Sequence, residues 1–291
     1  MKRIIQNLSV RLFLLLPLLL LSCERLSFDL DESSDTVSGL DVKCKITTVA
    51  AGTRSSLVKD AAQRLIWAIL DENGKIVKIG EQTRTNSKFG TLSIDADPGE
   101  YSLVIFAYDG SDSCSMADGG IVTPANNKVC DSFSAAIKTV VSKSKRQELS
   151  IVLKRCVAKF QVNSTDVVPE NVSRLHAVIN GVSLSYNILD SIGTEITDID
   201  RPVQQLGSQQ SGKTFNGYIY TFLPLDSADV TVRMDFLDAD NRPLYSHTFD
   251  SFQMRVNYIS SYKGPLFVNS GLNSDITVDD VWAGQIPIEY P

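Results

Sequence analysis

The sequence predicts an all-β fold, with β-sandwiches as the expected architecture. From about residue 41 onward, short runs rich in β-branched and aromatic residues alternate apolar with polar positions, which is typical of strands with one buried face. Turn pairs such as Asn-Gly and Pro-Gly separate these runs and favour tight connections. No long amphipathic helical pattern competes with the strands. Many short strands of this kind pack as facing sheets.

The first half of the chain has the clearest strand pattern. It begins with LDVKCKITTV, and QRLIWAILDENGKIV follows with a predicted hairpin at Asn73 and Gly74, because Asn-Gly suits a two-residue turn. A turn at Pro98 and Gly99 precedes EYSLVIFAY, which is typical of a core strand. The stretch DSFSAAIKTVVSK at 131–143 fits either a strand or one short helix.

The second half repeats this pattern after RQELSIVLKRCVAKFQV. Its expected strands are RLHAVINGVSLSYNI, FNGYIYTFLPL, DVTVRMDFLDADNRPLYSHTF, RVNYISSYKGPLF and SDITVDDVWAGQIPIEY. The polar stretch SKSKRQE before residue 150 is the best candidate for a junction. We therefore expect an N-terminal β-sandwich at 41–152 and a C-terminal one at 153–291, since the chain is long enough for two cores.

Residues 1–22 are predicted to be a lipoprotein signal peptide. Three basic residues precede the apolar run LFLLLPLLLL, which is too short to span a membrane. The run ends in LLSC, which resembles a lipobox, where a peptidase cuts before a lipid-modified cysteine. Cys23 is then the lipidated first residue, and the Ser- and Asp-rich residues 23–40 form a tether. An ordinary signal peptide and a short uncleaved anchor are the alternatives.

Removing the signal peptide leaves a strongly acidic chain. The 28 Lys and Arg residues fall by three to 25, against 34 Asp and Glu residues. A basic surface for nucleic acid or anionic lipid is therefore not expected. Membrane attachment would then depend on the lipid itself.

Four cysteines remain after Cys23, and they allow three pairings among which the sequence does not choose. Cys114 and Cys130 lie in a polar, glycine-containing stretch, where a disulfide would close a loop. Cys44 and Cys156 lie inside strand-like runs, as small buried apolar residues do. The spacing, with only two histidines in the chain, disfavours a metal site.

Residues 207–214 read GSQQSGKT, which matches the phosphate-binding loop of nucleotide-hydrolysing enzymes. That loop must leave a buried strand and open a helix. Here Pro202 interrupts the preceding run, and FNGYIYTFLPL, with Gly217 and alternating aromatic residues, follows the loop and predicts a strand. We therefore expect a loop between two strands and no nucleotide binding.

Other signatures of catalysis are weak. His176 and His247 each lie within an expected strand. Asp238, Asp240 and Asn241 match half of a calcium loop, but its glycine and distal glutamate are missing, so a hairpin turn is expected. We expect no enzyme activity and no cofactor, with a glycosidase carboxylate pair as an untested alternative among the many Asp and Glu residues.

In order and spacing, these features resemble the fimbrillin-like lipoproteins of type V pili, and among them the fimbrial anchor proteins. The resemblance rests on the lipobox and on the segments WAILDENGKIV, PGEYSLVIFAY, LKRCVAKFQV, YTFLPL and NYISSYKGPLF, and it covers most of residues 23–270. It implies two tandem transthyretin-like β-sandwich domains in a lipid-anchored protein of the cell outer membrane, exposed at the surface or in fimbriae. Such a protein anchors, or forms part of, an adhesive pilus, with other pilus subunits as partners.

The resemblance also implies assembly by β-strand addition. Polymerising subunits of that family lose an N-terminal strand by cleavage after a basic residue, and the next subunit's strand fills the groove. Arg54 in VAAGTRSS is a candidate cleavage point, which leaves anchor, stalk and tip roles open.

The tail at 272–291 is a candidate donor strand, because apolar side chains alternate there after a flexible Asn, Ser and Gly link. Its candidate donor residues are Ile276, Val278, Val281 and Trp282. The alternative of equal weight is that the tail pairs within its own second sandwich as an edge strand.

A surface glycan-binding lipoprotein of a polysaccharide-uptake system is the alternative function, because such systems also use lipidated β-sandwiches. Exposed, clustered tryptophans would favour it. Trp67 and Trp282 are the only two tryptophans, and both lie inside strand patterns, so the sequence favours the pilus protein.

Overall fold

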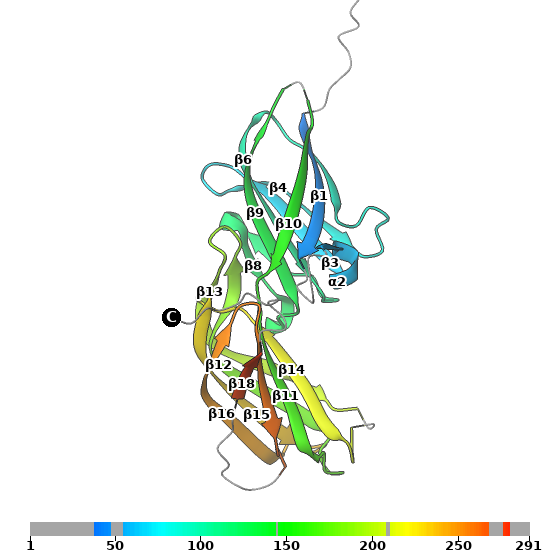
Figure 1. Ribbon diagram of the computed structural model, residues 1–291, viewed down its shortest axis with the longest axis vertical. Coiled ribbons are helices and arrows are strands. Elements are labelled where there is room, and N and C mark those ends of the chain that lie inside the picture. Colours follow the sequence, from blue (N-terminus) through cyan, green and yellow to red (C-terminus); the bar gives the residue numbers. More distant parts are fainter. Residues whose placement is uncertain (1–37, 48–54, 144, 208–209, 268–275, 280–291) are drawn as a thin grey trace, which may run out of the picture. The chain divides into compact units, whose positions relative to one another are not determined.

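The structure of the protein is a computed structural model that describes residues 38–47, 55–143, 145–207, 210–267 and 276–279. Strands make up nearly all of its regular elements (Figure 1), so the predicted all-β class is confirmed. The helical elements are short: α2 (Val58–Ala61), η1 (Asp118–Gly120) and η2 (Ala125–Asn127). Within these ranges, no helix is long and apolar enough to cross a membrane.

An eight-stranded sheet is built from the first half of the chain. Its strands are β1 (Gly39–Thr47), β2 (Ser55–Leu57), β3 (Arg64–Leu70), β4 (Ile76–Thr83), β5 (Thr91–Asp95), β6 (Gly99–Tyr108), β9 (Ser132–Val141) and β10 (Gln147–Arg155). Their order is β2-β1-β10-β9-β6-β3-β4, and β5 also pairs with β1. The stretch at 131–143, which fits strand or helix by sequence, is therefore a strand.

This sheet folds over along β10. The first seven residues of β10 pair with β1, whereas Lys154 and Arg155 pair with β9. One apolar core collects side chains of β1, β5 and β10 together with side chains of β3, β6 and β9. The two parts of the sheet thus face each other across a shared core, as in a β-sandwich.

The second half of the chain forms two further sheets. The four-stranded sheet has the order β14 (Thr214–Thr221), β11 (Ala158–Val167), β17 (Ile259–Gly264) and β18 (Ile276–Asp279). The six-stranded sheet has the order β16 (Pro243–Arg255), β15 (Ser227–Leu237), β12 (Arg174–Asn187), β8 (Ile121–Thr123) and β7 (Ser115–Ala117), with β13 (Ile192–Gln205) also paired to β12. Phe160 of one sheet packs against Phe249 and Phe252 of the other, with ring centroids 5.0 and 4.7 Å apart.

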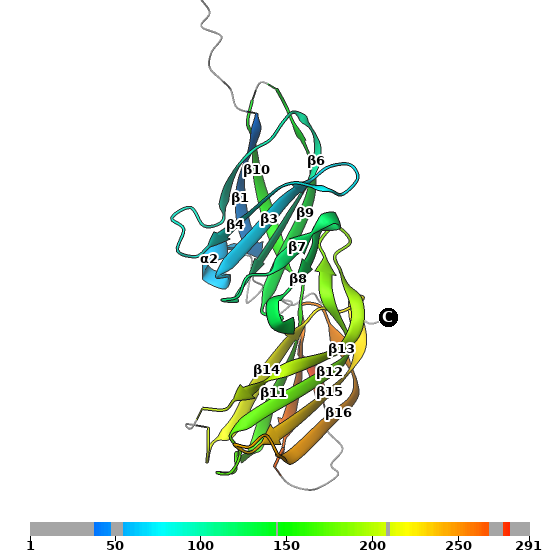
Figure 2. The same ribbon diagram turned by 180° about the vertical axis from the view of Figure 1, so that it is seen from behind.

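The hairpin of β7 and β8 comes from the first half of the chain but belongs to the six-stranded sheet. Val122 of β8 pairs with Tyr186 near the end of β12, and Figure 2 shows the hairpin from behind. A third core joins Phe106 of β6 with Tyr186 and Phe222. Strands β3 and β6 are therefore buried on both faces, which explains their nearly continuous apolar runs.

The expected domain boundary at residue 152 lies inside β10. Because the hairpin of β7 and β8 pairs with β12, the pairing crosses that boundary. The division into two domains at this residue stays a prediction.

The predicted hairpin turns depend on an aspartate at the start of each turn. Between β3 and β4, Asp71 Oδ1 accepts hydrogen bonds from the N–H groups of Asn73 and Lys75, both at 2.9 Å. Gly74 adopts φ +77°, a region open to glycine at little cost. Asp238 makes the same pair of hydrogen bonds in the turn between β15 and β16. The structure confirms both predicted turns. They could be predicted because their sequence signals are local.

Candidate functional site

Strand β1 lies inside its sheet and has neighbours on both sides. It runs parallel to β10, while its other side pairs antiparallel first with β5 and then with β2. The side chains of Leu40, Val42, Cys44 and Ile46 are between 0 and 6% exposed, whereas Lys43 is exposed. The alternation in the sequence therefore places one face of β1 in the core.

Hydrogen bonds from Arg146 hold the first residues of β1 in place, and we call this group of contacts the β1 clamp. The Arg146 guanidinium donates to Asp41 Oδ2 at 3.1 Å, to Asp95 Oδ1 at 2.6 Å and to the carbonyl oxygen of Leu40 at 3.2 Å. The hydrogen bonds from Arg146 and from Ser93 hold the pKa of Asp41 below its ordinary value. One side chain thus links β1 to β5 at the surface of the sheet.

The second half repeats the parallel arrangement with a shorter last strand. Strand β11 runs parallel to β17 and antiparallel to β14, and β17 pairs antiparallel with β18. Within the residues that the structure describes, β18 has β17 as its only strand neighbour. A strand in this position leaves one row of backbone N–H and C=O groups available to another strand.

Of the tail, residues 276–279 pair with β17 of their own sheet, an arrangement that agrees with the second of the two expectations for this segment. Ile276 and Val278 are both part of β18. Val281 and Trp282 lie outside the described residues, as do Cys23 and Arg54. Donation of this strand to another subunit stays a prediction.

Two of the four described cysteines have the burial that the sequence predicted. Cys44 and Cys156 are buried, as predicted, and burial raises the pKa of the Cys44 thiol to about 12. Cys114 and Cys130 are free thiols in this structure and are partly buried. The disulfide between Cys114 and Cys130 remains an untested prediction.

The GSQQSGKT segment connects two strands, as predicted. Thr214 begins β14, so a strand and not a helix follows the loop. The Gly212 N–H donates to the carbonyl oxygen of Val168 at 2.9 Å, and the Val168 N–H donates to the carbonyl oxygen of Lys213 at 2.8 Å. The Gly212 donor is therefore used within the fold and does not point at a phosphate.

Both histidines lie in strands, as expected. His176 Nε2 lies 2.6 Å from Asp200 Oδ1, and its Nδ1 lies 3.6 Å from Asp235 Oδ2. The ring of His247 packs against the ring of Phe249, with the ring centroids 4.5 Å apart. Burial lowers the pKa of His247. Across the described part of the chain, no cluster of three or more His, Cys, Asp or Glu side chains could hold a metal ion.

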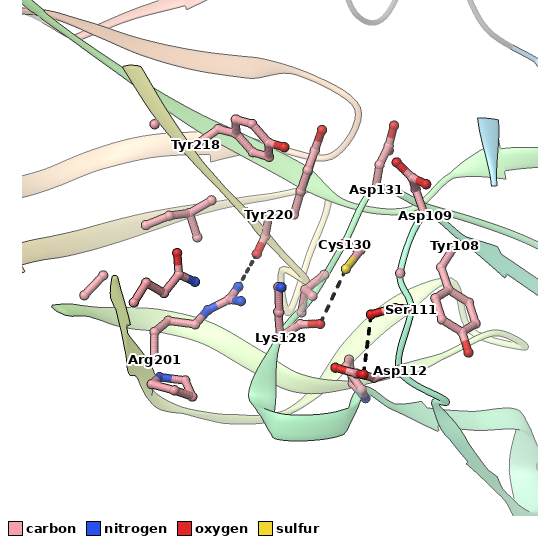
Figure 3. Close-up of a pocket in the computed structure, with 18 of the residues that line it drawn as sticks. Tyr108, Asp109, Ser111, Asp112, Lys128, Cys130, Asp131, Arg201, Tyr218 and Tyr220 are labelled. Atoms are coloured by element: carbon pink, nitrogen blue, oxygen red, sulfur yellow. Dashed lines mark hydrogen bonds between the residues drawn. The ribbon is translucent and has the colours of Figure 1, made fainter. Parts of the chain in front are cut away.

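A cavity of about 530 Å³ lies beside β14 (Figure 3) and includes Arg201, which the sequence analysis missed. Arg201 is 8% exposed and lies two residues after the buried Ile199 on β13. The period of two residues along a strand was the available signal, because it places this arginine on the buried face. Cys114 and Cys130 also line this cavity.

The sequence matches a family model along most of its length. The model describes fimbrillin-A associated anchor proteins Mfa1 and Mfa2, and it matches residues 32–283, a range that includes both β1 and β18. The chain belongs to this family. The predicted resemblance to fimbrial anchor proteins is confirmed, and this fimbria-associated adhesion family is not one of enzymes. The comparisons do not favour the polysaccharide-uptake alternative.

Two solved structures with TM-scores above 0.5 support the fold at low sequence identity. A candidate adhesin from Bacteroides thetaiotaomicron is 10% identical, with a TM-score of 0.52 over 86% of this chain and 98% of the other. A candidate polysaccharide-binding protein from the same species is 12% identical, with a TM-score of 0.52 over 84% and 96%. The fimbrial anchor protein Mfa2 from Porphyromonas gingivalis is 11% identical, with a TM-score of 0.42 over 77% and 90%. No curated protein matches the sequence.

Proposed function

We propose that this fimbrial anchor family member is an outer-membrane lipoprotein that anchors an adhesive pilus or serves as one of its subunits. The observation that carries the proposal is the family match over residues 32–283. A pilus anchor needs one attachment to the membrane and another to the fibre. Cys23 would provide the first, and strand addition at a sheet edge the second.

The membrane attachment is proposed to depend on a lipid at Cys23. The chain carries 34 acidic against 28 basic residues, so electrostatic attraction to anionic lipid offers no substitute. Cys23→Ser should abolish incorporation of a labelled fatty acid and move the protein from the membrane to the soluble fraction. The matched control is Ser22→Ala, which keeps the cysteine. Membrane retention of Cys23→Ser would count against lipid anchoring.

The attachment to the fibre is proposed to occur by donation of the tail strand that contains β18. Strand β18 is four residues long and is the last strand of its sheet among the described residues, so few hydrogen bonds oppose its release. Ser261 and Thr277 are register partners on β17 and β18, and opposed residues of neighbouring strands are close enough for an engineered disulfide.

The double variant Ser261→Cys with Thr277→Cys would lock β18 onto its own sheet. Under oxidising conditions we expect the locked protein to be excluded from fimbriae, and reductant should restore its incorporation. The single variant Ser261→Cys is the control. Equal incorporation of the locked and reduced forms would contradict strand donation.

The choice between anchor and fibre subunit is proposed to depend on β1. Cleavage after Arg54 would separate β1 from the rest of the chain, and its loss would open a groove lined by the partners of Leu40, Val42 and Ile46. Mass spectrometry of the surface protein distinguishes the two roles. An N-terminus at Cys23 indicates an anchor that keeps β1, whereas one at Ser55 indicates a processed subunit.

A further inference from the structure

The outer face of strands β1 and β10 carries three exposed lysines. They are Lys43 and Lys45 of β1 and Lys154 of β10, and the apolar residues that alternate with them belong to the core. The two strands run side by side in parallel (Figure 1), with Lys45 opposite Val152. Because side chains alternate along a strand, the three lysines share one face of the sheet.

Two exposed aliphatic side chains lie among these lysines. The register partners of Lys45 are Leu57 of β2 on one side and Val152 of β10 on the other. Leu57 is 54% exposed and Val152 is 45% exposed. We call Lys43, Lys45, Lys154, Leu57 and Val152 the lysine face. Apolar side chains beside lysines are typical of a surface that meets lipid headgroups, because the lysine stems cover apolar area while their ammonium groups reach the phosphates.

The lysines of this face have no carboxylate partner. Within the residues that the structure describes, none of the three takes part in an ion pair. Along the two strands the nearest carboxylates are Asp41 and Glu148, which lie opposite each other at one end of the face. Asp41 is already paired with Arg146. Three positive charges are therefore available to an anionic surface.

The outer face of the six-stranded sheet is, by contrast, mainly acidic. Asp198 and Asp200 of β13 and Asp229 of β15 are exposed, whereas Ile199 and Val230, which alternate with them, are buried. The excess of 34 acidic over 28 basic residues is thus unevenly distributed. The net charge did not reveal the lysine face, because it is a sum over the whole chain.

We propose that the lysine face rests on anionic lipid headgroups and orients the anchored protein at the membrane surface. The inference rests on the proposed lipid at Cys23. Strand β1 is the first described strand and begins at Gly39, sixteen positions after Cys23. A chain spans at most about 3.6 Å per residue, so the lipid keeps the start of β1 within about 60 Å of the bilayer. Such a tether raises the effective concentration of the face at the headgroups.

The contact supplements the lipid and does not replace it. Salt screens exposed charges beyond about 10 Å at 0.1 M ionic strength, so the lysine face acts only at short range. The net negative charge of the chain adds no long-range attraction to an anionic membrane. At physiological salt the Cys23→Ser protein should therefore still be soluble.

The test uses the mature chain, residues 23–291, with Cys23→Ser, at low ionic strength. The probe is a vesicle of phosphatidylcholine with about one third phosphatidylglycerol, because anionic lipid attracts surface lysines. Co-sedimentation with these vesicles should be saturable, should weaken as salt rises, and should be absent with phosphatidylcholine alone. The triple variant Lys43→Gln, Lys45→Gln, Lys154→Gln should partition at least about tenfold less, since each lysine near an anionic surface contributes about fivefold.

The matched control removes three exposed lysines from elsewhere on the protein. Lys75→Gln, Lys213→Gln and Lys263→Gln together change the net charge by the same amount. This control should partition as the Cys23→Ser parent does. Substitutions of exposed side chains have little effect on stability, and thermal unfolding of both triple variants checks this.

A second measurement locates the contact. Tryptophan fluorescence from Val152→Trp should be quenched by brominated phosphatidylglycerol in the vesicles. Val203→Trp on β13 is the control, because Val203 is 46% exposed and Val152 is 45% exposed. Its fluorescence should be quenched much less, since β13 lies outside the lysine face.

Several results would overturn the proposal: equal partition of the two triple variants, binding that ignores salt or anionic lipid, or quenching at Val203 in place of Val152. Self-association without lipid that only the lysine-face variant loses would assign the face to a second copy and overturn it as well. The lipid anchor fails separately. If fatty-acid labelling requires Cys23 but the triple variants partition equally, the anchor stands without the lysine face. If Cys23 carries no lipid but the vesicle results hold, the face stands and the anchor fails.

Discussion

Strands β1 and β18 lie near the two ends of the described chain, and they are held in their sheets very differently. β1 has nine residues, strand neighbours on both sides and four apolar side chains in the core. β18 has four residues and pairs only with β17 among the described strands. Each fully buried aliphatic side chain contributes about 1.5–3 kcal/mol, so removing β1 would open a core. The same alternating pattern in the sequence thus produces a strand inside a sheet in one place and, among the described residues, a short strand at the end of a sheet in the other.

The largest expected effect comes from placing a charge on the buried face of β1. Val42 is 0% exposed, and Val42→Asp would bury a carboxylate without a partner. We expect a loss of about 3–5 kcal/mol in the free energy of unfolding, or failure to fold. Urea unfolding measures it, with Lys43→Asp on the exposed face of the same strand as the control. Equal stability of both variants would mean that β1 is as dispensable as β18.

The next prediction concerns how the free energy of unfolding falls in acid. It compares the contributions of two carboxylates, Asp41 of β1 and Asp235 of β15. Burial alone would raise the pKa of Asp235, but hydrogen bonds from Arg233 and Ser246 lower it overall. The Asp235 side chain is 4% exposed, against 42% for Asp41. Because the folded pKa lies below the unfolded one, the contribution of Asp235 is present above its ordinary pKa of 3.8 and is lost as the pH falls through the folded pKa.

Asp235→Asn should therefore lower the free energy of unfolding at neutral pH by about 1–2 kcal/mol and flatten its decline in acid. Asp41→Asn should change the acid dependence much less, because solvent screens an exposed pair. Urea unfolding between pH 2 and pH 7 measures both. A larger effect at Asp41 would show that the surface clamp on β1 matters more than the buried carboxylate.

A smaller effect is expected from removing the clamp at the beginning of β1. Arg146→Ala loses the hydrogen bonds to Asp41, Asp95 and Leu40, which we expect to reduce stability by about 1 kcal/mol, since the network is partly exposed. Hydrogen exchange should accelerate at the first amides of β1, so that this end behaves more like β18. The neighbouring exposed Lys145 provides the control variant Lys145→Ala, whose exchange should match the wild type.

The sequence could predict the strands and turns because their signals are local. Alternation marks β1, nearly continuous apolar runs mark β3 and β6, and the aspartate turns need residues only two to four positions apart. It could not predict which strands pair. Leu40 lies opposite Gln147, and no local propensity encodes a partner more than 100 residues away. The addition of β7 and β8 to the six-stranded sheet was missed for the same reason.

The candidate sites were harder to predict from the sequence than the fold was. The tail at 272–291 was noticed because its alternation is local, but the sequence could not show that Ile276–Asp279 pair with β17, because a strand partner is not a local property. Arg201 was missed because a single charged residue in a strand looks like a solvent-exposed one. Only the surrounding cavity, with Asp131 already paired to Arg155, gives this arginine its significance.

The smallest expected effect on stability comes from deleting residues 272–291. The deletion removes β18, which contributes one short hydrogen-bonded ladder at the end of a sheet, while Phe160, Phe249 and Tyr262 remain in the core beside it. We expect the free energy of unfolding to fall by less than about 1 kcal/mol, since backbone hydrogen bonds at an edge exchange readily with water. Urea unfolding gives the stability, and co-purification with fimbriae gives the function. Nearly wild-type stability with loss of fimbrial association fits a strand that serves another subunit. A loss of several kcal/mol would instead make the tail a packed element of its own fold, as β1 is, and the contrast between the two strands would disappear.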